Sequence, residues 1–175
     1  MIYIFVLNGS PRSGKDTLTD FFSEYGLVHH FSYVDAVRDM LKSMHIDFSR
    51  KTDKDRQLME SICNALEKYD DVPMKRLCSS VRYAIDVENW RNLGHSNNGF
   101  IFVDIRKPDN IERFKKEFPE TITLYVEDGK DVNNVTESDA SVKDYKYDYC
   151  IKNTGTLPEF EQAVSEFIKE NLEIV

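Results

Sequence analysis

Residues 9–17 form a glycine-containing segment whose residue types suit phosphate binding: Gly9-Ser-Pro-Arg-Ser-Gly-Lys-Asp-Thr. Gly9, Gly14 and Lys15 give the spacing G-x-x-x-x-G-K, which is typical of a phosphate loop. Glycines let the backbone curl so that successive N–H groups point at phosphate oxygens, and the lysine adds a mobile cation. A plain turn with a solvated lysine is the alternative. The residues predicted to bind nucleotide phosphates are Gly9, Ser10, Arg12, Ser13, Gly14, Lys15, Asp16 and Thr17.

Two aspartates are candidate Mg²⁺ ligands. Asp16 stands directly after the lysine, where phosphate loops usually carry a hydroxyl residue, and a carboxylate also binds Mg²⁺, directly or through water. Asp104 follows an apolar run, where a carboxylate of the metal's outer shell is expected. Two plainer roles stay open. Asp16 would then only complement a helix dipole, and Asp104 would be a turn residue.

Two arginines and a further aspartate suit a second, phosphorylated substrate. A dianionic phosphate is well matched by planar guanidinium groups, so Arg38 and Arg106 are candidate ligands for an acceptor phosphate. Asp35 is expected either to orient Arg38 or to act as a base. Surface ion pairs for the arginines and a helix N-cap role for Asp35 are the alternatives.

Strands and helices alternate along the chain, which predicts where these side chains meet. Apolar and β-branched runs predict buried strands, whereas apolar residues at helical spacing predict amphipathic helices. Such alternation favours a mainly parallel sheet with helices on both faces, and ligands bind at the carboxyl ends of its strands. We predict one domain over residues 1–175. The expected strands are 2–7, 28–33, 100–105, 121–126 and 149–151, and the expected helices are 16–25, 35–44, 53–69, 74–93, 108–118 and one that starts at 156.

Composition excludes several classes of protein. The chain has 175 residues, of which 41% are hydrophobic and 31% charged, as in an ordinary globular domain. Its net charge of −8 argues against nucleic acid as the main partner, and no apolar run is long enough to span a membrane. Three widely spaced cysteines indicate a reducing compartment, so we expect a cytoplasmic location. The four histidines lack zinc-site spacing and are expected to be packed or solvent-facing.

The segment that begins at Asn8, Asn8-Gly-Ser-Pro-Arg-Ser-Gly-Lys-Asp-Thr-Leu, resembles the phage-type deoxynucleoside monophosphate kinases. The tetrapeptide G-K-D-T is characteristic of that family, and weaker likeness continues in order through residues 31–38, 102–110 and 149–157. The resemblance implies a three-layer P-loop NTPase fold, ATP and Mg²⁺ as donor and cofactor, and a (deoxy)nucleoside monophosphate as acceptor. It also implies that Asn153 lies near the adenine, that residues 35–95 bind the acceptor and that residues 127–147 form a lid.

The candidate lid departs from the family pattern because it contains no arginine. Glu127 and Asp128 stand where the family tends to have one, and Arg12 or Arg56 is the candidate replacement. Two other functions therefore stay open. One is a kinase for another small acceptor, such as dephospho-coenzyme A, with Asp35 as the base for a hydroxyl group. The other is a nucleotide-binding module with little catalysis.

Overall fold

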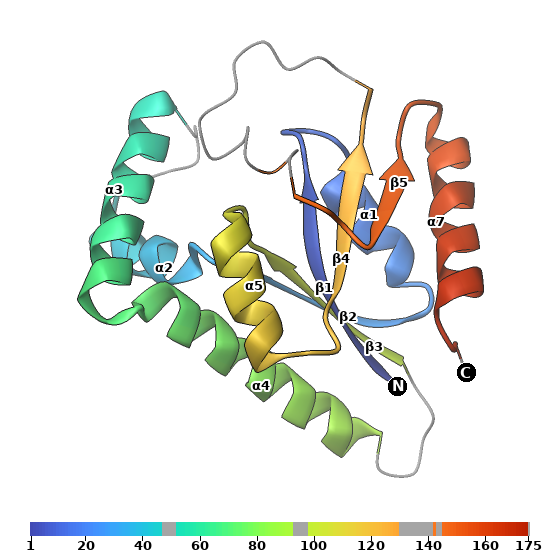
Figure 1. The fold of residues 1–175 in the computed structure, drawn as a ribbon, viewed down its shortest axis with the longest axis horizontal. Helices are drawn as coiled ribbons and strands as arrows, with labels where there is room; N and C mark the ends of the chain where they lie inside the picture. Colours follow the sequence, from blue (N-terminus) through green and yellow to red (C-terminus); the bar gives the residue numbers. More distant parts are fainter. Residues whose placement is uncertain (47–51, 93–97, 130–141, 143–144, 175) are drawn as a thin grey trace.

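A computed structural model describes residues 1–46, 52–92, 98–129, 142 and 145–174, and its centre is one sheet of five strands (Figure 1). All neighbouring strands are parallel, in the order β2-β3-β1-β4-β5. The strands are β1 (Ile2–Gly9), β2 (Gly26–Ser32), β3 (Asn98–Asp104), β4 (Ile122–Glu127) and β5 (Tyr149–Lys152). The predicted strands are therefore confirmed, with small differences at their ends.

The strand β1 lies at the centre of the sheet, between β3 and β4. Phe5 pairs with Phe102 of β3, and Leu7 pairs with Leu124 of β4. Phe5 and Leu7 are fully buried, because helices cover both faces of the strand. From β1 the chain crosses to β2 on one side, and from β3 it crosses to β4 on the other. The crevice between β1 and β3 is therefore the switch point at which such sheets bind ligands.

Helices cover both faces of the sheet, as predicted (Figure 1). One face packs against α1 (Lys15–Phe22) and α7 (Leu157–Asn171), and we call it the α1 face. The other packs against four helices, and we call it the α4 face. These helices are α2 (Asp35–Ser43), α3 (Asp53–Asp70), α4 (Val72–Arg91) and α5 (Pro108–Glu117). Within the described residues, every helix is too short or too polar to cross a membrane.

The two faces have differently built cores. On the α1 face, the ring of Phe22 meets Phe100 and Phe102 edge-on at 5.1 and 5.0 Å, and Phe5 stacks on Phe102 at 5.0 Å. Such aromatic pairs add about 0.5–1.5 kcal/mol each beyond their burial. On the α4 face the core is mainly aliphatic. Its fully buried members include Val37, Val81, Val103, Ile101, Ile105 and Ile111.

Some sequence expectations were wrong in detail. The first helix ends at Phe22 and not near residue 25, because residues 23–25 form a turn that leads into β2. The last helix was expected to start at residue 156, where Thr156 is its N-cap, and Leu157 in its first turn is 62% exposed. Leu58 and Trp90 are also exposed, at 41% and 74%, because they point away from the sheet.

Candidate phosphate-binding site

The loop between β1 and α1 has the backbone of a phosphate loop. Gly9, Arg12 and Gly14 have positive φ angles of 153°, 65° and 98°. Mixed left- and right-handed residues turn successive N–H groups toward one concave side, which binds anions. A Cβ atom on Gly9 would lie 2.7 Å from the Val126 carbonyl oxygen, and one on Gly14 would lie 2.4 Å from the Asn153 amide nitrogen. Only glycine therefore fits these two positions.

Lys15 begins α1 and folds back over this loop. Its Nζ atom donates hydrogen bonds to the carbonyl oxygens of Gly9 and Ser10, both at 2.9 Å. The ammonium group is thus held at the rim of the concave side, next to the positive end of the α1 dipole. Loop, lysine and helix start together form a cradle for phosphate oxygens.

Asn153 supports the loop from the end of β5. Its Nδ2 atom donates to the Ser13 carbonyl oxygen at 2.7 Å, and its backbone N–H donates to Glu127. The resemblance predicted this residue beside the adenine, and the structure places its amide on the loop backbone. Ser13 itself is fully buried, and its hydroxyl has no hydrogen-bond partner within the described residues. Thr17, one turn into α1, is half-buried.

Asp35 and Arg38 lie together at the carboxyl edge of the sheet. One Asp35 carboxylate oxygen accepts the Ser32 backbone N–H at 2.7 Å, and the other accepts from Arg38 at 2.9 Å. Asp35 thus holds Arg38, whose side chain is 51% exposed and reachable by a ligand. Arg106 is exposed two residues beyond the end of β3, at the same edge.

The two candidate metal ligands flank a histidine that sequence reasoning missed. Asp104 ends β3, and Asp16 is exposed in the first turn of α1. The Nε2 atom of His30 lies 3.3 Å from an Asp104 carboxylate oxygen. This contact raises the pKa of His30. Burial opposes the shift, and the charges of Asp104, Asp16 and Asp35 add to it. Strand alternation was the available signal, because it places His30 on the same face as Asp104.

These acids suit Mg²⁺ better than a tightly caged metal. Within the described residues, no three His, Cys, Asp or Glu side chains are grouped so that they could hold a metal ion. Mg²⁺ usually keeps several waters and binds one or two carboxylates together with substrate phosphates. Asp16 and Asp104, next to a phosphate cradle, therefore fit a Mg²⁺ ion that arrives with a nucleotide.

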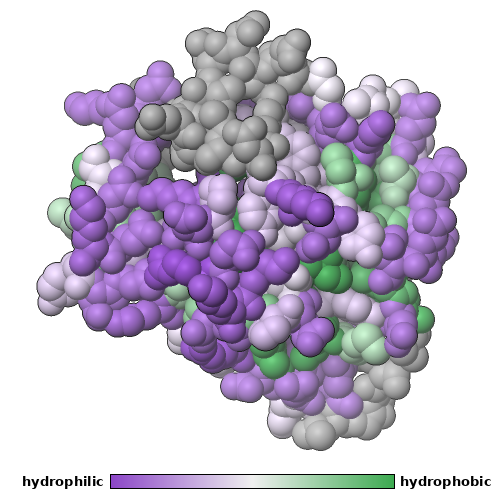
Figure 2. All heavy atoms as spheres, viewed as in Figure 1, coloured by the Kyte–Doolittle hydropathy of each residue, from purple (hydrophilic) through white to green (hydrophobic). Residues whose placement is uncertain are grey.

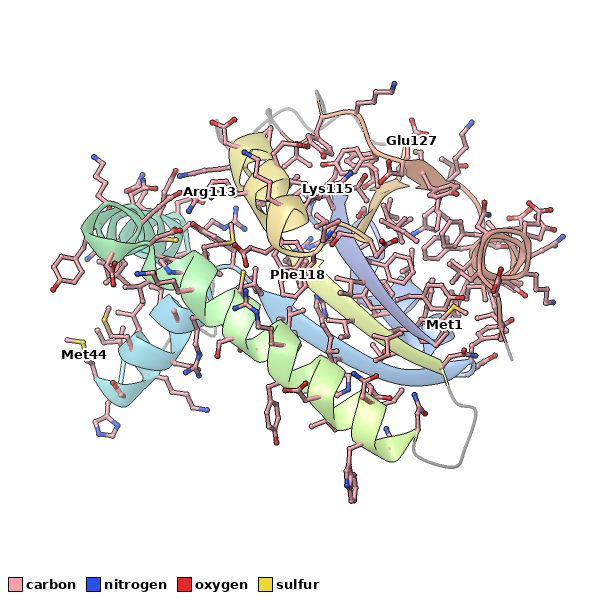
Figure 3. All side chains as sticks on the ribbon, turned by 60° about the horizontal axis from the view of Figure 1, so that its bottom comes forward. Met1, Met44, Arg113, Lys115, Phe118 and Glu127 are labelled. Carbon is pink, nitrogen blue, oxygen red and sulfur yellow. The ribbon has the colours of Figure 1, made fainter. Side chains whose placement is uncertain are left out.

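Charged side chains tie the helices of residues 35–95 to α5. Lys107 donates to Asn64 at 2.9 Å and lies 3.3 Å from Glu67, both on α3. Arg113 contacts Glu67 at 3.5 Å and also contacts Asp71, between α3 and α4. In Figure 3, Arg113 lies on the side of α5 that faces α3 and α4. Figure 2 shows mainly hydrophilic residues over α3 and α5. The surface over α3 and α5 is thus polar, and ion pairs hold α3 against α5.

The candidate lid can be located only at its two ends. Residues 130–141 and 143–144 lie outside the described residues. At the near end, β4 stops at Glu127. At the far end, the Tyr145 hydroxyl donates to Glu112 on α5 at 2.6 Å, and the Tyr147 hydroxyl donates to the Val142 carbonyl oxygen at 3.0 Å. The near end therefore lies at the carboxyl edge that carries the phosphate loop, whereas the far end leads into the amino end of β5, beside the start of β4.

Comparison with known proteins defines the fold. No protein-family description matches this chain, and no curated protein matches it. Among solved structures, it is similar to a dephospho-CoA kinase from Campylobacter jejuni, with 14% identity over 97% of both chains and a TM-score of 0.53. It is also similar to a sugar kinase from Janibacter, with 11% identity over 100% of this chain and 99% of that chain and a TM-score of 0.52.

Structural similarity at such low sequence identity establishes the fold but not the function. The strand order, the helices on both faces and the loop after β1 are those of the three-layer α/β P-loop NTPase fold. The predicted fold class is thereby confirmed.

Proposed function

We propose that this protein is a nucleotide kinase that transfers the γ-phosphoryl group of ATP to the phosphate of a (deoxy)nucleoside monophosphate, with Mg²⁺ as cofactor. The observation that carries the proposal is the loop of residues 9–14, in which Gly9, Arg12 and Gly14 have positive φ angles. Lys15 follows it at the start of α1 and donates to the loop carbonyls. The two similar structures are kinases for other small molecules, which supports phosphoryl transfer in general. The G-K-D-T segment supports the choice of a deoxynucleotide acceptor.

The donor side of the site binds and orients the triphosphate. The loop N–H groups and Lys15 bind the β- and γ-phosphate oxygens, and Thr17 binds the α-phosphate. Arg12 is exposed within the loop, and within the described residues its guanidinium has no acidic partner. It therefore contacts the γ-phosphate and supplies charge that the arginine-free lid does not. Positioning and charge neutralisation are the main contributions of a protein to this reaction.

Asp16 and Asp104 hold the cofactor on the donor side. Bound Mg²⁺ would neutralise part of the phosphate charge. Because Asp16 brings its own negative charge close to the triphosphate, we expect nucleotide binding to depend strongly on the metal.

The acceptor side binds a phosphate and needs no base. Arg38 and Arg106 lie at the carboxyl edge of the sheet, where planar guanidinium groups suit a dianionic phosphate. An acceptor phosphate is already ionised near neutral pH. Asp35 uses both oxygens on Ser32 and Arg38, so it acts as a positioning residue for Arg38. The helices of residues 35–95 form the wall that selects the acceptor.

A turnover assay tests the proposal. Purified protein is incubated with ATP, Mg²⁺ and a panel of nucleoside and deoxynucleoside monophosphates, and ADP formation is measured. We expect ADP formation with one or a few acceptors, and its loss in Lys15→Ala but not in the surface control Lys169→Ala. Measurable ATP binding without ADP formation on any acceptor would instead support a nucleotide-binding module.

A hydroxyl acceptor such as dephospho-coenzyme A is the second candidate, because a dephospho-CoA kinase is one of the similar structures. Dephospho-coenzyme A therefore joins the panel. A hydroxyl group needs a base, so in that case Asp35→Asn would lower kcat by about 100-fold or more. With a phosphate acceptor, the same change would mainly raise the KM of the acceptor, because only the orientation of Arg38 is lost.

A further inference from the structure

His30 lies on the α1 face of the sheet, the face that carries the phosphate loop. Side chains alternate along β2. Val28 packs into the core of the α1 face, whereas Phe31 packs into that of the α4 face. His29 contacts Glu88 of α4, so it also points to the α4 face. His30 therefore points to the side of α1, two residues before the carboxyl end of β2 at Ser32.

The imidazole of His30 is next to the acids proposed to hold the metal. Its Nε2 atom lies 3.3 Å from Oδ1 of Asp104, an ion-pair distance just beyond the usual range of an N–H···O hydrogen bond. That oxygen is buried and makes no hydrogen bond within the described residues, and its contact with His30 is an ion pair. The two side chains are 32% and 33% exposed, so both remain within reach of solvent and ligand. The charges of Asp16 and Asp35 also act on the ring.

We propose that His30 is a positioning residue for the metal site: in the loaded site its Nε2–H, 3.3 Å away in this structure, donates to Oδ1 of Asp104 and fixes the orientation of that carboxylate. Oδ2 is then left to bind the metal or a water of its shell. This inference rests on the proposed function, because it takes Asp104 to be a metal ligand. The physical reason is that a terminal carboxylate group rotates freely unless something holds it. Groups that orient metal-binding carboxylates typically change metal affinity by about 10- to 100-fold.

Two substitutions separate this role from a purely structural one. His30→Leu removes the donor and keeps an apolar side chain of moderate size. His30→Gln keeps an N–H donor on a side chain of similar reach. His29→Gln is the matched control, because it makes the same change one residue earlier and on the opposite face. Each variant is first checked for an unchanged fold by circular dichroism and thermal unfolding.

The test measures Mn²⁺ binding in the presence of ATP by electron paramagnetic resonance, together with the Mg²⁺ concentration that gives half-maximal turnover. We expect His30→Leu to weaken metal binding by about 10-fold or more and to raise the Mg²⁺ requirement in parallel. Binding of ATP without metal should not change. His30→Gln should recover most of the loss, and His29→Gln should match the wild type.

A double-mutant cycle shows whether the effect passes through Asp104. In an Asp104→Asn background, changing His30 to Leu should cost no further metal affinity, because there is no ligand left to orient. Equal Mn²⁺ binding by the wild type and His30→Leu would overturn the inference and leave the proposed function intact. A wild type that binds no Mn²⁺ with ATP would overturn the proposed function and, with it, the inference.

Discussion

The strand β2 carries two neighbouring histidines on opposite faces of the sheet, and each contacts a carboxylate. His29 meets Glu88 at 3.0 Å, and Glu88 also accepts from Arg91 at 3.2 Å and is only 1% exposed. His30 meets Asp104 at 3.3 Å, and both side chains are about one third exposed. The acid on the α4 face is thus buried with two partners, whereas the acid on the α1 face is accessible at the edge of the phosphate site.

The comparison indicates how this small protein uses its acidic residues. A buried carboxylate with partners contributes to stability, and losing the partners would leave a costly buried charge. An accessible carboxylate beside a phosphate loop contributes little to stability and stays available to a metal. Substitutions at the phosphate loop and at Asp104 should therefore change activity, and those at Glu88 should change the free energy of unfolding.

The largest expected effect is on the α1 face. Lys15→Ala removes the cation that the loop carbonyls hold at the phosphate cradle. We expect turnover to fall by about 100- to 1,000-fold, as when a preorganised charge donor is removed from other sites. The midpoint of urea unfolding should stay within error of the wild type. Turnover equal to that of Lys169→Ala would contradict the assignment of this loop.

On the α4 face, Glu88→Ala should act in the opposite way. It leaves His29 and Arg91 without their common partner and opens space beside Gly99. We expect a loss of about 1–3 kcal/mol in the free energy of unfolding, since the partners keep some access to water. The activity of the folded protein should not change. Urea titration measures the free energy of unfolding. Glu88→Gln, which keeps an acceptor oxygen, should show a smaller loss of it.

A smaller effect is expected where β5 supports the loop. Asn153→Ala removes the hydrogen bond to the Ser13 carbonyl oxygen, which is worth about 1 kcal/mol, or about fivefold in an equilibrium constant. We expect ATP affinity to fall by that factor with kcat nearly unchanged, because the loop is less well held but its charges remain. Isothermal titration with ATP and Mg²⁺ measures the change. Unchanged ATP affinity would mean that the loop keeps its shape without Asn153.

The smallest expected effect is a pH dependence of the stability that Asp148 contributes on the α4 face. Burial by itself raises the pKa of Asp148, but hydrogen bonds from the Thr123 backbone and hydroxyl, with the charge of Lys115, outweigh it and lower the pKa below 3.8. Asp148 therefore stabilises the fold above that value, and the contribution is lost as the pH falls through the lowered pKa. Lys115, whose charge helps to lower the pKa of Asp148, lies on the side of α5 away from α3 (Figure 3).

Thermal unfolding across acid pH tests this expectation. Asp148→Asn should be less stable than the wild type at about pH 6, and the difference should shrink as both proteins are taken below about pH 4. ATP binding at neutral pH should be equal in the two proteins, because Asp148 binds Thr123 near the start of β4, whereas the phosphate loop lies at the end of that strand. A difference in unfolding temperature that stays constant with pH would contradict the role of its charge.

Much of the fold could be predicted from local patterns. The run of residues 2–7 is apolar apart from the Tyr3 hydroxyl, which suits a strand buried on both faces. The last helix starts where it was predicted, with Thr156 as its N-cap, and Thr156 and Glu159 form a capping box there. Exposure along the helices was harder to predict. Trp90 has the right spacing for the core, yet it is 74% exposed because it points away from the sheet.

The sequence by itself determined the phosphate loop and the order of strands and helices, because both depend on residues close together in the chain. Glycine positions, the lysine and the hydrophobic periods needed no long-range information. Only the tertiary structure decided which polar groups meet across the chain. It brought His30 to Asp104 and put Asn153 on the loop. These contacts depend on strand order and register, which bring together residues that no spacing in the sequence connects.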